Sequence, residues 1–199
     1  MPVRADRLYP SDRMAAISDG VFAVALTLLV LDIKPPEGAA SALVAALVSI
    51  APQLGIFALS FAIVSYYWIV HHLIFASLSG VTLGLMWVNL AFLFTVVVLP
   101  FSTAVLGRYP LFPPALAIYG INLAACTSAL AVAWCVADRT KLIEQQKPGQ
   151  RRYTVRRLAT QSGFSLLGVA CAFAYPWLAL TIFVATPVVY ALTYQRSYW

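Results

Sequence analysis

Charged residues are scarce in this chain of 199 residues, because Asp, Glu, Lys and Arg together make up only 10% of the sequence. Hydrophobic residues make up 62%, and the mean hydropathy of +0.85 lies far above that of soluble domains. So little charge excludes a soluble globular domain of any size. We therefore predict an all-α fold and a polytopic membrane protein.

Residues that carry enzymatic chemistry are also few. The two histidines, His71 and His72, are adjacent and so point to different faces of a helix, unlike a metal pair at four-residue spacing. The three cysteines show no CxxC spacing, and we interpret them as small buried hydrophobic residues. Ser162-Gly163 lacks the flanking residues of a serine nucleophile, and there is no Gly-rich phosphate loop. We expect no enzymatic activity, no metal site and no cofactor.

Long apolar stretches fill the rest of the chain. A helix crosses the hydrocarbon of a bilayer with about 20 apolar residues. Six such stretches predict six transmembrane helices, at roughly residues 12–33, 40–70, 82–106, 112–137, 155–174 and 176–195. Pro52 and Gly55 predict a kink in the second span. Together with a basic linker at residues 138–154, the spans form a single membrane domain over residues 1–199.

Basic residues cluster at the start of the chain and between the fourth and fifth spans. The ten residues concerned are Arg4, Arg7, Arg13, Arg139, Lys141, Lys147, Arg151, Arg152, Arg156 and Arg157. The positive-inside rule makes both regions cytoplasmic, and an even number of spans returns the C-terminus to the same side. We expect a multi-pass protein with both termini in the cytoplasm and the lipid bilayer as its surroundings. Because topology explains the net charge of +6, we expect no nucleic-acid partner.

The first span has two distinct faces. At about 100° per residue, one stripe holds Gly20, Val24, Thr27, Leu28 and Leu31. The opposite side holds Asp19, Phe22, Leu26, Leu29 and Ile33. Thr27 is the lone hydroxyl of its stripe, and periodicity leaves two interpretations open. Its hydroxyl could bond back to a carbonyl one turn earlier, which periodicity alone favours, or it could line a pore.

Polar residues gather at the cytoplasmic ends of the first three spans. An ionised side chain at membrane depth costs about 2.5 kcal/mol or more, so Asp19 should lie near a helix end, be paired, or both. The polar residues available to it predict one network, formed by Arg13, Ser18, Asp19, His71, His72 and Asn89. We expect the network mainly to tie three helices together. A gating or pH-sensing role is the alternative, since histidine titrates near neutral pH.

The first half of the chain resembles a known family. Arg13-xxx-Ile17-Ser18-Asp19-Gly20 followed by VFAVALTLLVLDI closely resembles the RxxxFSD signature of the lysosomal potassium channel family (transmembrane protein 175) and its prokaryotic homologues, with Ile17 in place of the usual Phe. SFAIVSYYWIVHHLIF and LMWVNLAFLFTVVVLPFSTA resemble the second and third spans of that family. Like the family, the chain lacks the TVGYG filter of ordinary potassium channels.

The resemblance implies a potassium-selective cation leak channel in a prokaryotic plasma membrane. A single copy of the signature implies one six-span repeat and a homotetramer, with the first helix of each subunit lining a central pore. The constriction of the family carries over, position by position, to Val24, Thr27, Leu28 and Leu31. It implies a hydrophobic gate, with the permeant potassium ion passing near Thr27, and makes the pore wall the preferred interpretation of that hydroxyl.

The resemblance also implies that Arg13, Ser18 and Asp19 hold the pore helix, with His71 or His72 and Asn89 as partners. Two other functions are compatible with a polytopic chain. The first is a proton-coupled secondary transporter that uses Asp19 and the two histidines, although transporters commonly show an internal repeat and none is visible here. The second is a membrane scaffold without ion flux.

Overall fold

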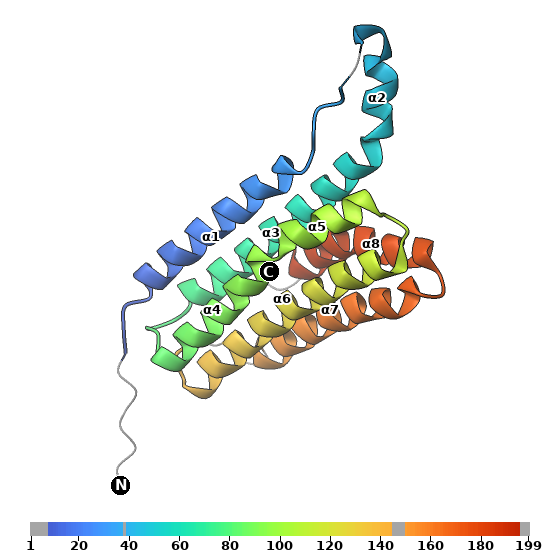
Figure 1. Ribbon diagram of the computed structural model, residues 1–199. Coiled ribbons are helices and arrows are strands. Elements are labelled where there is room, and N and C mark those ends of the chain that lie inside the picture. Colours follow the sequence, from blue (N-terminus) through green and yellow to red (C-terminus); the bar gives the residue numbers. More distant parts are fainter. Residues whose placement is uncertain (1–7, 38, 145–149, 196–199) are drawn as a thin grey trace.

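The computed structural model describes residues 8–37, 39–144 and 150–195, and all of its elements are helices (Figure 1). They are α1 (Asp12–Leu31), η1 (Ala40–Ala42), α2 (Leu43–Ser49), α3 (Ala51–Ala76), α4 (Leu83–Val97), α5 (Leu99–Arg108), α6 (Pro113–Arg139), α7 (Gln150–Ala172) and α8 (Pro176–Gln195). Helix α6 lies inside the bundle and contacts α3, α4, α5, α7 and α8. Helix α1 packs on α3, α4 and α5, on the opposite side of the bundle from α7.

Four helical stretches of the described chain are long and apolar enough to cross a membrane. They are Asp12–Leu31, Ala51–Ala76, Leu83–Arg108 and Pro113–Arg139, which correspond to the first four predicted spans. The fifth and sixth predicted spans coincide with α7 and α8. Helix α7 opens with four arginines within residues 150–157, and the apolar stretch Pro176–Val189 of α8 is shorter than a full span. The protein is therefore an all-helical membrane protein.

The second span differs from the prediction of one kinked helix over residues 40–70. The chain forms a separate short helix, α2, and α3 starts again at Ala51 and continues to Ala76. Pro52 lies in the first turn of α3, where its missing N–H removes no helical hydrogen bond. Pro52 therefore marks the start of a new helix and does not introduce a kink within a continuous one. Helix α2 has no buried residue and extends away from the bundle (Figure 1).

A second proline divides the third span. Helix α4 ends at Val97 and α5 begins at Leu99, with Pro100 in its first turn. Near this break Asn122 of α6 donates from Nδ2 to the carbonyl of Thr95 over 2.9 Å, and its Oδ1 accepts from the Ser102 hydroxyl over 2.8 Å. The Asn122 amide thus satisfies a backbone carbonyl that would have no access to water in a bilayer.

Helices α6, α7 and α8 meet around one buried ring. Phe183 of α8 is fully buried and meets Tyr119 of α6 edge to face, with 5.5 Å between the ring centroids. Gly120 of α6 and Gly168 of α7 both lie against this ring, and a Cβ atom at either position would overlap it. Glycine at these two positions therefore sets how closely the three helices approach.

Backbone pairing joins three connections at one end of the bundle. Tyr9 and Val81 exchange two hydrogen bonds of 2.9 Å each. On the other side of the α3–α4 connection, Ser79 N donates to the carbonyl of Leu142 and Glu144 N donates to that of Ser77, each over 2.9 Å. We call this region (residues 8–9, 77–81 and 142–144) the α3–α4 end. The residues before α1 are paired with the α3–α4 connection, which is in turn paired with the α6–α7 connection.

The basic linker is shorter than the predicted 138–154. Helix α6 runs to Arg139 and α7 begins at Gln150, so both helices take up residues assigned to the linker. Arg4, Arg7 and Lys147 lie outside the described residues. Most of the predicted linker arginines therefore stand on the first turns of α7.

Candidate functional site

Helix α1 buries one face against its own subunit. The buried residues are Met14, Ser18, Phe22, Ala25 and Leu29. Their spacing of three or four residues is that of a single helical stripe. Phe22 is the centre of this contact, because its ring lies 5.8 Å from that of His71 on α3 and 6.0 Å from that of Phe92 on α4. The buried face therefore fixes the rotation of α1 about its own axis.

The predicted stripe lies on the other face of α1 and is exposed. Val24 is 56% exposed and Leu31 is 70% exposed, and Gly20, Thr27 and Leu28 are exposed as well. The Thr27 hydroxyl donates to the carbonyl of Val24 over 2.8 Å. Thr27 is thus both bonded to the backbone and directed away from its own subunit, so the two interpretations of its role are compatible.

A buried amide joins α1 to α3 and α4. Asn89 of α4 donates from Nδ2 to Ser18 Oγ over 3.1 Å and to Met14 Sδ over 2.9 Å. Its Oδ1 lies 2.8 Å from His71 Nε2, which is the donor because a carbonyl oxygen can only accept. The Ser18 hydroxyl in turn donates a hydrogen bond of 2.9 Å to the carbonyl of Met14. The structure therefore brings together Ser18, His71 and Asn89, three of the six residues of the predicted network.

The imidazole of His71 is enclosed by aromatic rings. It stacks on Phe75 with 4.2 Å between centroids and on Phe92 with 5.5 Å, and it is only 2% exposed. A ring held by stacking and by one amide contact is fixed in place. These surroundings suit a packing role in the helix interface.

The other three residues of the predicted network lie elsewhere. Asp19 is exposed and accepts at Oδ1 a hydrogen bond of 2.8 Å from Trp68 Nε1, and His72 stacks on the same indole with 5.7 Å between centroids. Within the described part of the chain, the exposed side chain of Arg13 makes no hydrogen bond or ion pair. The predicted network is therefore two separate groups, one buried around Asn89 and one exposed around Trp68, and Arg13 belongs to neither.

Two residues of this region were missed in the sequence. Trp68 was not included in the predicted network, although it lies four residues before His72 and so shares its face of α3. Its indole N–H also requires an acceptor when it leaves water. Gln53 donates from Nε2 to the carbonyl of Asp32 over 3.1 Å and so holds the far end of α1 to α3. No pattern in the sequence pointed to Gln53.

The segment that forms this site matches a family of known proteins. The profile described as endosomal/lysosomal potassium channel TMEM175 matches residues 13–100, from α1 to the start of α5. A potassium channel of Chamaesiphon minutus is 30% identical over 200 residues, which cover 96% of this chain and 98% of the relative. The chain belongs to the TMEM175 family. Every stripe and network residue of α1, α3 and α4 lies inside the matched segment.

Further relatives match more than nine-tenths of the chain. A potassium channel of Chryseobacterium sp. is 29% identical over 92% of this chain and 94% of its own. The crystal structure of a lysosomal potassium-selective channel TMEM175 homolog from Chamaesiphon minutus superposes with a TM-score of 0.79 at 28% identity, covering 92% of this chain and 96% of that one. The crystal structure of a variant of the potassium channel MtTMEM175 is 18% identical and shares the fold with a TM-score of 0.63. The superposition covers 96% of this chain and 90% of that one.

Proposed function

We propose that this protein is a potassium-selective leak channel in which α1 of each of four copies lines a central pore. The observation that carries the proposal is the exposed stripe of α1. Val24, Leu28 and Leu31 point away from the bundle along a helix that buries a different stripe, centred on Phe22, against α3 and α4. The two curated relatives that match 92% and 96% of the chain are named potassium channels, which supports the same function.

The proposed topology has six membrane crossings, made by α1, α3, the α4–α5 pair, α6, α7 and α8. The basic residues near the start of the chain and around the α6–α7 connection support, by the positive-inside rule, a cytoplasmic side for the α3–α4 end. Both termini then lie on that side. More than one copy is required because one α1 helix offers only one wall of a pore, and the number four is the one that the resemblance to the family implies.

The proposed gate is a set of apolar rings. At 1.5 Å per residue, Val24 and Leu31 are separated by roughly 10 Å along the axis of α1. Rings of aliphatic side chains over such a length exclude water when the pore is narrow, and ions cannot pass a dewetted constriction. Opening then requires the four helices to tilt or rotate outward.

Thr27 is the proposed contact for the ion. Because its proton is donated to the Val24 carbonyl, the hydroxyl oxygen presents lone pairs to the pore. Four such oxygens form a weakly polar ring for a partly hydrated cation. Potassium gives up its water more readily than sodium, so a weak ring favours potassium.

The buried group around Asn89 is proposed to hold the stripe toward the pore axis. It joins α1 to two helices of the same subunit, so α1 cannot turn without breaking its hydrogen bonds. The transporter alternative has no comparable support, because His71 and Asp19 belong to separate groups and His71 is enclosed by phenylalanines.

Leu28→Ala is expected to raise potassium flux by about tenfold, equivalent to about 1.4 kcal/mol removed from the barrier. The smaller side chain widens an apolar ring, so less energy is needed to wet it. The measurement is potassium flux into liposomes that contain the purified protein. Thr27→Val in the same assay is expected to lower the ratio of potassium to sodium flux, since it removes the oxygen.

Leu90→Ala is the matched control, because Leu90 on α4 is 44% exposed and Leu28 is 39% exposed. It removes the same atoms from a helix face that is not part of the proposed pore, and flux is expected to stay unchanged. Unchanged flux and selectivity in both Leu28→Ala and Thr27→Val would disprove the pore assignment. A purified protein that conducts as a monomer would disprove the tetramer.

A further inference from the structure

The outward face of α7 changes from basic to apolar along the helix. Arg152 and Arg156 are exposed on its first two turns, and Leu166 and Leu167 are exposed at 52% and 50% further along. The distance from Arg156 to Leu166 is about 15 Å along the axis. The opposite face is buried, with Leu158, Gln161 and Ser165 packed inside the bundle. Such a gradient on an unburied face is typical of a helix that passes from headgroups into hydrocarbon.

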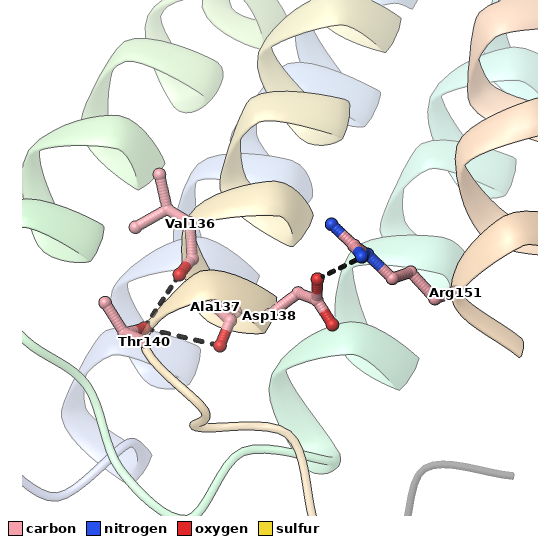
Figure 2. A network of polar contacts seen from close by, with 5 residues as sticks. All are labelled: Val136, Ala137, Asp138, Thr140 and Arg151. Carbon is pink, nitrogen blue, oxygen red and sulfur yellow. Dashed lines mark hydrogen bonds and ion pairs between the residues drawn. The ribbon is translucent and has the colours of Figure 1, made fainter.

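The end of α6 lies beside the start of α7 and contacts Arg151, which does not belong to this outward face (Figure 2). The Thr140 hydroxyl donates to the carbonyls of Val136 (2.7 Å) and Ala137 (3.3 Å), and the chain then reverses at Lys141, which has a φ of 56°. Leu142 N donates to the carbonyl of Ala137 over 2.9 Å, which completes a Schellman-type helix end. The last turn of α6 therefore stands beside the start of α7.

Asp138 on that last turn binds Arg151 of α7, with 2.8 Å between Oδ2 and Nε (Figure 2). The ion pair satisfies one arginine and turns it toward α6. Arg152 and Arg156 lie about 100° and 140° around the helix from Arg151 and so face away from the bundle. The carboxylate of Asp138 is thus already engaged by Arg151.

The two outward arginines form an unbalanced pair of charges. They are four residues apart and therefore adjacent on the helix surface, where like charges repel. In residues 8–37, 39–144 and 150–195, neither guanidinium has a hydrogen bond or an ion pair. A phosphodiester would relieve the repulsion, because each guanidinium can bind phosphate oxygens in bidentate fashion.

We propose that Arg152 and Arg156 bind the phosphate headgroup of an anionic phospholipid. The acyl chains of the lipid lie along the exposed apolar residues of the same face, which include Leu166 and Leu167. The continuity between the basic pair and this apolar surface selects a membrane lipid over free phosphate. The site lies on the opposite side of the bundle from α1 and does not depend on the pore proposal.

The test is native mass spectrometry of the purified full chain titrated with phosphatidylglycerol or phosphatidylcholine. Phosphatidylglycerol is expected to bind the wild type more tightly. Arg152→Gln or Arg156→Gln is expected to weaken it about fivefold each and the double variant about thirtyfold, since a basic residue near an anionic surface contributes about 1 kcal/mol. Excess inorganic phosphate is expected not to compete.

Arg108→Gln is the matched control, because Arg108 is an exposed arginine at the end of α5, beside the α5–α6 connection and not at the α3–α4 end. It is expected to leave phosphatidylglycerol binding unchanged. Arg152→Lys combined with Arg156→Lys keeps both charges and is expected to retain most of the binding, which guards against misfolding of the glutamine variants. Equal binding of the two lipids by the wild type, equal loss in Arg108→Gln, or full binding by the double glutamine variant would overturn the proposal.

Discussion

Replacement of Gly168 by alanine is expected to lower the free energy of unfolding by about 2 kcal/mol, within the range for overpacked cores. The new Cβ would overlap Cε1 of Phe183 and lie 2.8 Å from its Cζ. That ring cannot move aside easily, because it is fully buried and contacts Tyr119 on its other side. The measurement is thermal or denaturant unfolding of the purified protein in detergent micelles.

Gly163→Ala on the same helix is the control, because a Cβ at that position meets no atom within 4 Å. Alanine is a better helix former than glycine by roughly 0.5–1 kcal/mol, so this variant is expected to be as stable as the wild type or more stable. Phe183→Leu is expected to restore part of the stability lost in Gly168→Ala. Equal stability of the two alanine variants would show that α7 and α8 do not meet as closely as described.

Replacement of Asn89 by alanine is expected to cost about 2 kcal/mol, because it leaves buried polar groups of His71 and Ser18 without their partner. It also removes the polar link between α1 and α4. The rotation of α1 is then less well fixed, so we expect potassium flux per folded channel to change as well. Thermal unfolding and liposome flux on the same preparation measure the two effects.

Asn122→Ala separates stability from function. Asn122 is also a buried amide with partners on neighbouring helices, but it contacts α4 and α5 and not α1. We expect a similar loss of stability with unchanged flux per folded channel. A double-mutant cycle of Asn89→Ala with Ser18→Ala is expected to give a coupling energy above about 0.5 kcal/mol. Additive effects, or the same change of flux in both asparagine variants, would contradict the assigned role of Asn89.

The long helices could be predicted because length and apolar composition determine them locally. Helix α1 was expected at residues 12–33 and spans Asp12–Leu31, and α6 was expected at 112–137 and spans Pro113–Arg139. The breaks at Ile50 and Val98 could not be predicted as breaks. A proline signals only that one hydrogen bond is missing, and the outcome depends on partners from distant helices, such as Asn122 for the carbonyl of Thr95.

The faces of α1 were predictable for the same local reason, since burial repeats with the helical period. The partner of Asp19 was not predictable. Ser18 and Asp19 are adjacent, so they point about 100° apart, and a sequence does not reveal which neighbouring helix each direction meets. The structure shows that Ser18 meets Asn89 while Asp19 meets Trp68.

The backbone pairing of Tyr9 with Val81 also sets an order of events during synthesis. The two residues are about 70 positions apart, which at roughly 5–20 residues per second corresponds to about 4–14 s of translation. During that interval α1 leaves the ribosome before its starting residues have a partner, so water must satisfy their backbone groups. The second pairing, between Leu78 and Ile143, can form only after about 60 further residues have been translated. The starting end of α1 is therefore paired only after α2 and α3 have been made, and before the α6–α7 connection is joined to the same region.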